Sequence, residues 1–228
     1  MQVSKQNNDI GNMNIRLIIF DFDGTLGDTR RNIVMTLQQT MREKHLPMTD
    51  EGRCAATIGL TLKDSFKTLF PHLSDEEAEE CATTYRRIFE VNKKKMVPRL
   101  FPNVAETLAE LKRRGITMSV ASSRNAASLR SFLKDMGIEQ YIAYVLGADD
   151  VAKPKPDAEP VMKTLATLGF AADETLVVGD MPVDILMGRN AGTRTCGVTY
   201  GNASRQQLEE AGADFIIGDM GELPNCLT

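Results

Sequence analysis

The chain has 228 residues, 42% of them hydrophobic, and its 27 Lys and Arg against 31 Asp and Glu give a net charge of -4. This length suffices for one sizeable domain, or for a domain with a smaller insert. The lack of a basic excess argues against nucleic acid as a partner. No apolar run approaches the roughly 18 residues that cross a bilayer, and the start of the sequence lacks an apolar signal segment, so we expect a cytoplasmic protein with no membrane partner.

Residues 1–12 are rich in Gln, Asn, Ser and Gly, and this composition predicts a flexible tail. The run from Ile15 to Phe20 is apolar apart from one arginine, which is typical of a central parallel strand buried on both faces. Asp21 and Asp23 follow it directly, and extended geometry would direct both carboxylates to the same side. Such buried carboxylates need a partner, for which a metal cation is the natural choice, although Asp23-Gly24 is also a common turn pair.

The segment 29–97 contains helical patterns and no strand pattern. Helices are predicted at Arg30–Lys44, at Ala55–Phe70 and from Asp75 to about Val91, the last of them opened by a capping box. About 70 residues without a strand exceed an ordinary loop, so we interpret 29–97 as an inserted helical cap. Two prolines then mark the return of the chain.

From Pro102 onward helices and strands alternate. Helices are predicted at Val104–Arg114, Ala126–Met136 and Pro160–Leu168, and strands at Ile116–Ala121, Tyr141–Leu146, Thr175–Val178, Thr195–Thr199 and Asp214–Ile217. Repeated units of this kind imply an α/β fold, a Rossmann-like three-layer core with a parallel sheet. The core would comprise residues 13–28 and 98–228, interrupted by the helical cap domain.

Ligands of open α/β sheets bind at the carboxyl ends of the strands, where this chain has several polar residues. Ser122 and Ser123 follow the second predicted strand, Lys153 follows the third and Asp180 follows the fourth. Each has an ordinary structural explanation as well. A serine can cap a helix, and lysines in loops are usually exposed.

The segment Asp-Phe-Asp-Gly-Thr-Leu at 21–26 resembles the first signature of the haloacid dehalogenase superfamily, whose members are mostly phosphohydrolases. Ser122, the segment Lys153-Pro154-Lys155-Pro156 and the segment from Gly179 to Asp184 resemble its other three motifs, in the right order. The resemblance implies that Asp21 is a nucleophile and that Asp23 is a general acid and base. True dehalogenases lack the second of these acids.

The same resemblance assigns the remaining site residues. Ser122 and Ser123 would hold phosphoryl oxygens, and Gly24 is grouped with them as a substrate-binding residue. Lys153 would offset negative charge, and it is preferred to Lys155 because the pattern Lys-Pro-x-Pro begins there. Mg²⁺, which favours hard oxygen ligands, would be held by side chains of the signature acids and by the backbone carbonyl of Asp23. The implied metal ligands are Asp21, Asp23, Asp180 and Asp184.

The resulting hypothesis is a Mg²⁺-dependent phosphatase that acts on a small phosphorylated metabolite through an aspartyl phosphate. The cap resembles the C1 type, and residues 56–62 are similar to a segment of phosphoglycolate-phosphatase-like caps, with Thr61 in place of proline. A β-phosphoglucomutase-like enzyme is the nearest alternative, although such mutases usually have a histidine where this chain has residues 29–32. Less favoured alternatives are a pyrophosphatase and a catalytically silent binding protein. The sequence does not distinguish a monomer from a homodimer.

Overall fold

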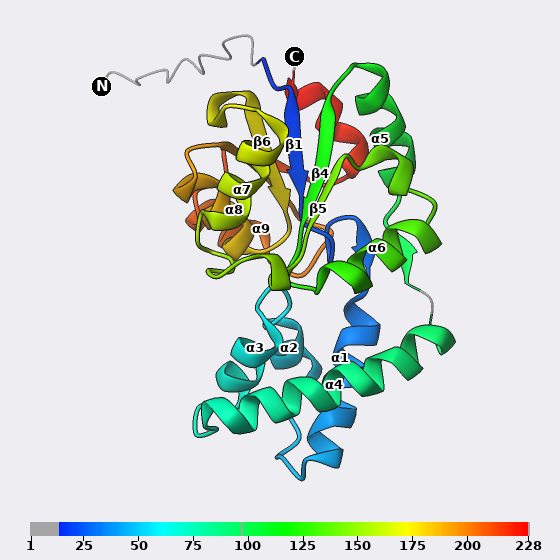
Figure 1. Cartoon of the computed structure of the whole chain (residues 1–228), viewed down its shortest axis with the longest axis vertical. Coiled ribbons are helices and arrows are strands. Elements are labelled where there is room, and N and C mark those ends of the chain that lie inside the picture. The colour runs from blue at the N-terminus through cyan, green and yellow to red at the C-terminus, as the bar shows by residue number, and fades with distance from the viewer. Residues whose placement is uncertain (1–13, 97, 228) are drawn as a thin grey trace, which may run out of the picture.

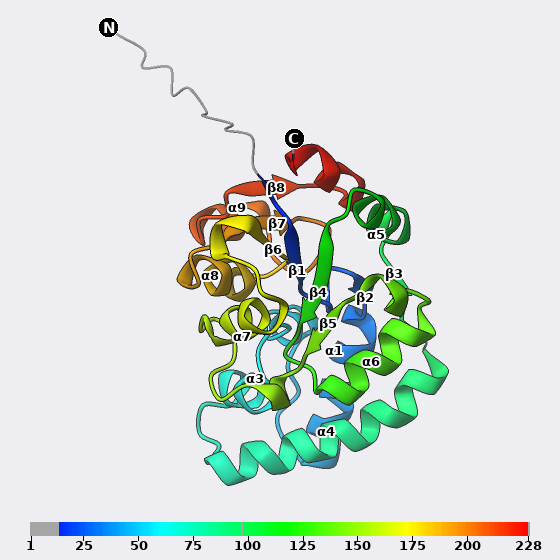
Figure 2. The ribbon, with the colours of Figure 1, turned by 45° about the horizontal axis from the view of Figure 1, so that its top comes forward.

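The structure, a computed structural model, describes residues 14–96 and 98–227. The predicted tail at 1–12 lies outside the described residues. Six parallel strands form one sheet in the order β5-β4-β1-β6-β7-β8 (Figures 1 and 2). Their bounds are β1 Leu17–Phe20, β4 Thr117–Ala121, β5 Tyr144–Leu146, β6 Thr175–Gly179, β7 Arg194–Val198 and β8 Phe215–Ile217.

Helices cover both faces of the sheet, which confirms the three-layer α/β fold (Figure 1). Because side chains alternate along a strand, β1 serves both faces. Ile18 and Phe20 pack in one buried cluster with α5 and α6, and Leu17 and Ile19 pack in another with α7 and α8. The bounds are α5 Val104–Arg113, α6 Ala126–Asp135, α7 Glu159–Leu168, α8 Pro182–Asn190 and α9 Arg205–Glu210, with 3-10 turns η1 Glu139–Tyr141, η2 Ala148–Asp150, η3 Ala172–Glu174 and η4 Met220–Leu227.

Four helices lie between β1 and β4 and form the helical insert, which extends beyond the carboxyl ends of the strands (Figures 1 and 2). They are α1 Arg30–Glu43, α2 Glu51–Ala55, α3 Leu62–Leu69 and α4 Asp75–Lys95. The predicted capping box is confirmed, since the Ser74 hydroxyl accepts from the Glu77 amide and the Ser74 amide donates to the Glu77 carboxylate. Within the described part of the chain, no helix combines the length and apolarity needed to cross a membrane.

The predicted helix at Ala55–Phe70 is wrong in its first half. Residues 56–61 form turns between α2 and α3, because Gly59 has a φ of 96° and therefore cannot continue a right-handed helix. Thr61 then caps α3 by accepting a hydrogen bond of 3.2 Å from the Asp64 amide. The sequence predicts one continuous helix here, whereas the structure has a loop that contacts Ser123, just after β4.

A short antiparallel ribbon joins the two segments that connect the insert to the sheet. It pairs β2, Gly27–Asp28, with β3, Arg99–Leu100. Neither strand was predicted, since each has only two residues and β3 lies within the proline-rich return segment. The ribbon fixes the start and the end of the insert beside each other.

Candidate active site

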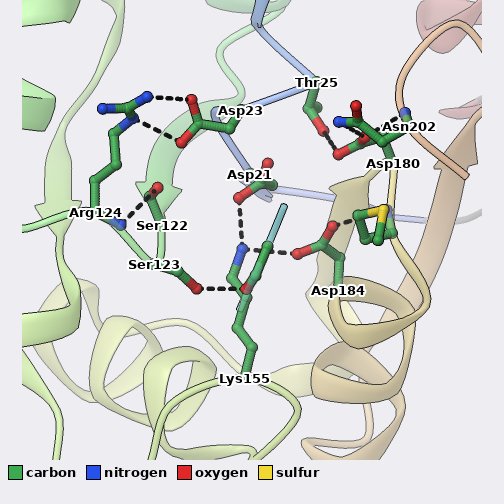
Figure 3. Close-up of polar contacts among 12 residues, drawn as sticks. Asp21, Asp23, Thr25, Ser122, Ser123, Arg124, Lys155, Asp180, Asp184 and Asn202 are labelled. Atoms are coloured by element: carbon green, nitrogen blue, oxygen red, sulfur yellow. Dashed lines mark hydrogen bonds and ion pairs between the residues drawn. The ribbon is translucent and has the colours of Figure 1, made fainter. Parts of the chain in front are cut away.

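Buried carboxylates meet at the carboxyl ends of the two central strands (Figure 3). Asp21 follows β1, Asp180 follows β6, and Asp184 lies in the first turn of α8. Each offers an oxygen, and these oxygens lie within 4.8 Å of one another. The Asp21 amide donates to the Val178 carbonyl at 2.8 Å, so the sheet hydrogen bonding itself continues to the site. Three of the predicted metal-ligand side chains are therefore brought together.

Asp180 is held by neighbouring loops rather than by a charge. Its carboxylate accepts hydrogen bonds from the Thr25 hydroxyl at 3.2 Å and from the amide and side chain of Asn202 at 2.7 and 2.8 Å. Gly24 lies against it with a φ of 95°, and a Cβ there would come within 2.2 Å of an Asp180 oxygen. Gly24 thus contacts this carboxylate and lies outside the cavity described below.

Lys155 provides the buried positive charge next to the three carboxylates. Its ammonium group donates to Asp21 at 2.6 Å and to Asp184 at 2.7 Å, and its side chain is only 3% exposed. Burial alone would lower the pKa of this lysine, but the Asp184 and Asp21 carboxylates raise it above its usual value. Lys155 therefore stays charged and offsets part of the negative charge.

The position predicted for Lys153 is thus taken by Lys155, and the expected placement of Lys153 is wrong. Lys153 is exposed, and its backbone amide donates to the Glu159 carboxylate at 2.7 Å. Glu159 also accepts from the Ala152 amide at 3.0 Å, which fixes the turn before α7. The turn leaves the first lysine of the Lys-Pro-Lys-Pro segment at the surface and brings the second one to the site.

Asp23 is held away from the three carboxylates. Arg124 donates two hydrogen bonds to it, at 2.6 and 2.8 Å, and the Thr29 hydroxyl donates a third at 2.5 Å. The guanidinium of Arg124 also lies 4.7 Å from the ring of Phe89 in the insert and 4.8 Å from the ring of Phe132 in α6. Sequence reasoning missed Arg124, although its place directly after Ser122-Ser123 at the end of β4 was a usable signal.

A cavity of about 500 Å³ lies between the helical insert and the sheet and is lined by Asp21 and Asp23. Ser122 and Ser123 line it too, so the predicted phosphate-contacting residues face the same space as the predicted nucleophile. The Ser122 hydroxyl accepts from the Arg124 amide at 3.2 Å, and the Ser123 hydroxyl donates to the Gly59 carbonyl at 2.6 Å. The second bond links the insert to the loop after β4.

Burial and the proximity of the carboxylates to one another disfavour their ionised forms. Burial, reinforced by Asp184 and Asp23, raises the pKa of Asp21 to about 7 despite the attraction of Lys155. Burial and the Asp21 charge raise the pKa of Asp180 as well. In addition, the Asn202 side-chain oxygen near Asp180 is buried without a hydrogen-bond partner. Three carboxylates and a free amide oxygen supply the hard oxygen atoms that a divalent cation requires.

Comparison with known proteins agrees with this geometry. Residues 18–198 match the haloacid dehalogenase-like hydrolase family, and the chain belongs to that family. The fold also matches a crystal structure of this class from Bacteroides fragilis, with a TM-score of 0.88 and 28% identity over 92% of this chain and 99% of that one.

Curated relatives of similar length carry three different names. "Probable phosphatase IndB" of Dickeya dadantii is 38% identical, covering 91% of each chain. Pyrophosphatase PpaX of Halalkalibacterium halodurans is 30% identical, covering 92% of this chain and 96% of its own. Phosphoglycolate phosphatase of Photorhabdus laumondii is also 30% identical, covering 92% and 91%. The predicted family is therefore confirmed, and the relatives differ in what their names say they act on.

Proposed function

We propose that the protein is a divalent-cation-dependent phosphatase that hydrolyses a phosphate monoester through an aspartyl phosphate on Asp21. The observation that carries this proposal is the placement of Asp21. It is a buried carboxylate, 2.6 Å from the Lys155 ammonium, that also borders a cavity containing Ser122 and Asp23. A nucleophile and a second acid thus line one cavity, and the compensating cation contacts the nucleophile.

Each residue then has a distinct role. Asp21 attacks phosphorus, while Lys155 limits the repulsion between the carboxylate and the phosphate anion. The Ser122 hydroxyl, whose oxygen already accepts from Arg124, can donate its own proton to a phosphoryl oxygen. Asp23 protonates the leaving oxygen and then removes a proton from water. To do so it must exchange one of its contacts with Arg124 for the reacting group.

The metal fits the acids at the ends of β1 and β6. Asp21, Asp180 and Asp184 would hold Mg²⁺, together with the backbone carbonyl of Asp23. When bound, the cation supplies positive charge that polarises the phosphoryl group. The helical insert acts as a cap that keeps bulk water from the cavity during the transfer to Asp21.

Measuring inorganic phosphate release from a panel of phosphate monoesters, with Mg²⁺ and with a chelator, tests the proposal. We expect release that requires the cation and falls by more than about 10³-fold in Asp21→Asn, because the covalent route is lost. Phosphate release by Asp23→Asn should fall by about 10²-fold or more. Phosphorylated protein should accumulate if attack by Asp21 is faster in this variant than hydrolysis of the aspartyl phosphate. Full activity of Asp21→Asn, in protein shown to be folded, would contradict the nucleophile.

A phosphosugar mutase is the less favoured alternative. Residues 29–32 contain no histidine, and neither His45 nor His72 lines the cavity between insert and sheet. Interconversion of sugar phosphates without phosphate release would nevertheless establish it. Pyrophosphate hydrolysis is suggested by the names of several relatives. The charged residues that line the cavity bear on whether a second phosphate can bind.

A further inference from the structure

The volume of the cavity, with the helical insert packed against the rest of the protein, limits what the substrate can be. The insert contacts the loop after β4 at two points: the Gly59 carbonyl accepts from the Ser123 hydroxyl at 2.6 Å, and the Phe89 ring lies against the Arg124 guanidinium. A Cβ on Gly59 would also be 3.3 Å from Val183 of α8. The insert is therefore packed against the end of the sheet, and a cavity of about 500 Å³ that is partly open to solvent lies between them.

A small substrate with two anionic ends would leave much of this space empty. Pyrophosphate and phosphoglycolate each have nine non-hydrogen atoms, which occupy about 270 Å³ at most if each takes the ~30 Å³ of a water molecule in the liquid. Cavities of 300–1,000 Å³ are typical of sites for larger organic ligands. The space beyond the phosphate is thus sized for a substantial leaving group.

The insert presents an apolar surface to that space, beside polar and charged side chains. The insert contributes aliphatic and aromatic side chains from three of its helices and from the 56–61 loop. They are Ile33, Leu37, Ile58, Leu60, Leu62, Tyr85 and Phe89. Such a wall gains free energy by covering an apolar group, and gains nothing from a second phosphate or carboxylate.

The charges lining the cavity also disfavour a second anion. Three lining side chains are cationic and five are acidic: Lys63, Arg86, Arg124, Asp21, Asp23, Glu79, Glu90 and Asp149. Lys63 pairs with Asp75 and Arg86 with Glu79, both at exposed positions. Arg124 is the least exposed of these three cations, with a side chain 11% exposed, and both side-chain hydrogen bonds of Arg124 go to Asp23. Drawing Arg124 to a second anion would remove the charged partner of the buried Asp23 carboxylate and leave it only the Thr29 hydroxyl.

Building on the proposed phosphatase function, we infer that the substrate is a phosphate monoester with one anionic group and a bulky, uncharged leaving group that has an apolar or aromatic face. The phosphate binds at Asp21 and Ser122, and the leaving group fills the space against the insert. Small substrates with a second anionic end, such as pyrophosphate and phosphoglycolate, are poor substrates of this chain.

Four substrates test this inference with the Mg²⁺-loaded protein: 2-phenylethyl phosphate, ethyl phosphate, phosphoglycolate and pyrophosphate. The first three share an alkoxide leaving group, so differences among them report recognition rather than intrinsic reactivity. We expect kcat/KM for 2-phenylethyl phosphate to exceed that for each of the others by at least about tenfold, because a phenyl group offers several methylene equivalents of contact. A preference below about threefold over ethyl phosphate, or faster turnover of phosphoglycolate or pyrophosphate, would overturn the inference.

A variant that fills the cavity provides the second arm. Leu60→Trp should lower kcat/KM for 2-phenylethyl phosphate by tenfold or more and change that for ethyl phosphate by less than about threefold. Leu186→Trp, at a position of α8 that is 37% exposed and outside the cavity, is the matched control and should change neither. Leu60→Ala is measured alongside, in case the larger side chain prevents folding, and it should weaken the same preference. Equal losses for both esters in the folded Leu60 variants count against the inference.

The two levels of the proposal fail separately. Release that disappears in Asp21→Asn yet favours pyrophosphate or phosphoglycolate rejects only the leaving-group inference. No release from any of the four substrates, or release that persists in Asp21→Asn, rejects the phosphatase itself.

Discussion

Two lysines that lie two residues apart have opposite surroundings. Lys155 is buried between Asp21 and Asp184, whereas Lys153 is exposed and contacts the turn before α7 through its backbone. The sequence predicts that one lysine of this segment reaches the site, but a repeated Lys-Pro pair offers two registers. What decides between them is Glu159, whose carboxylate accepts from two backbone amides and so fixes how the loop enters α7. These contacts join residues only six and seven apart, but the Lys-Pro pattern by itself does not specify which lysine they leave at the surface.

Substituting each lysine separately distinguishes their roles. We expect Lys155→Met to lower kcat/KM for phosphate release by on the order of 10²-fold or more, because it removes the charge beside the nucleophile. Lys153→Met should stay within about twofold, as for other surface substitutions. Steady-state kinetics on one phosphate monoester measures both.

Loss of Lys155 also leaves two acids without their partner and should lower the free energy of unfolding. Circular dichroism and thermal unfolding with Mg²⁺ therefore accompany the kinetics, and Lys155→Arg serves as the variant that retains the charge. A large loss in Lys153→Met with little change in a folded Lys155→Met would return the role to Lys153.

At the scale of elements, the strands were easier to predict than the insert. The four strands that carry Asp21, Ser122, the lysine loop and Asp180 were all predicted, because buried apolar runs bounded by glycine and polar residues are strong local signals. The turns at 56–61, in the first half of the predicted helix Ala55–Phe70, were not. The apolar residues of Ala55–Phe70 fit a helical period, yet the loop at 56–61 is held by contacts with Ser123 and α8 that lie far away in sequence.

Gly59 provides a test of how this loop positions the insert. Its φ of 96° strains any other residue, and a Cβ would also press on Val183 at 3.3 Å. Gly59→Ala should cost about 1–2 kcal/mol of stability and should raise KM several-fold, because the loop that lines the cavity shifts. Thermal unfolding and kinetics measure the two effects.

Gly137→Ala is the matched control. Gly137 has a φ of 68°, but nothing lies within 4 Å of its added Cβ and it does not line the cavity. It should lose a similar amount of stability through backbone strain alone and keep its KM. An unchanged KM in Gly59→Ala would mean that the loop contributes to folding and not to the arrangement of the cavity.

For the molecule as a whole, the most unfavourable electrostatics lie at the centre of the fold. Asp21, Asp180 and Asp184 are buried near the ends of the two middle strands, and the Lys155 ammonium group contacts Asp21 and Asp184. The apolar clusters on both faces of the sheet must therefore stabilise a site that resists being charged. The protein should then be most stable when something neutralises that site.

The raised pKa of Asp21 predicts how the stability of the protein depends on pH. Since the pKa of Asp21 is raised to about 7 in the fold from an ordinary value of 3.8, the unfolded chain loses this proton first as pH rises. The folded state is progressively penalised between about pH 4 and 7, and the full penalty, at most ~4 kcal/mol, is present above pH 7. Without a divalent cation, Asp21→Asn should therefore melt above the wild type at pH 8, and the gap should shrink at pH 5.

Mg²⁺ should narrow that gap, because it binds the folded acids and not the unfolded chain. At a concentration one hundred times Kd it would add about 2.7 kcal/mol to the wild type and less to Asp21→Asn or Asp180→Asn, each of which lacks one carboxylate. Thermal unfolding at pH 5 and pH 8, with Mg²⁺ or with a chelator, measures every combination. If the wild type were the more stable protein at pH 8 in the chelator, the penalty assigned to Asp21 would be absent; equal Mg²⁺ shifts in all three proteins would place the cation elsewhere.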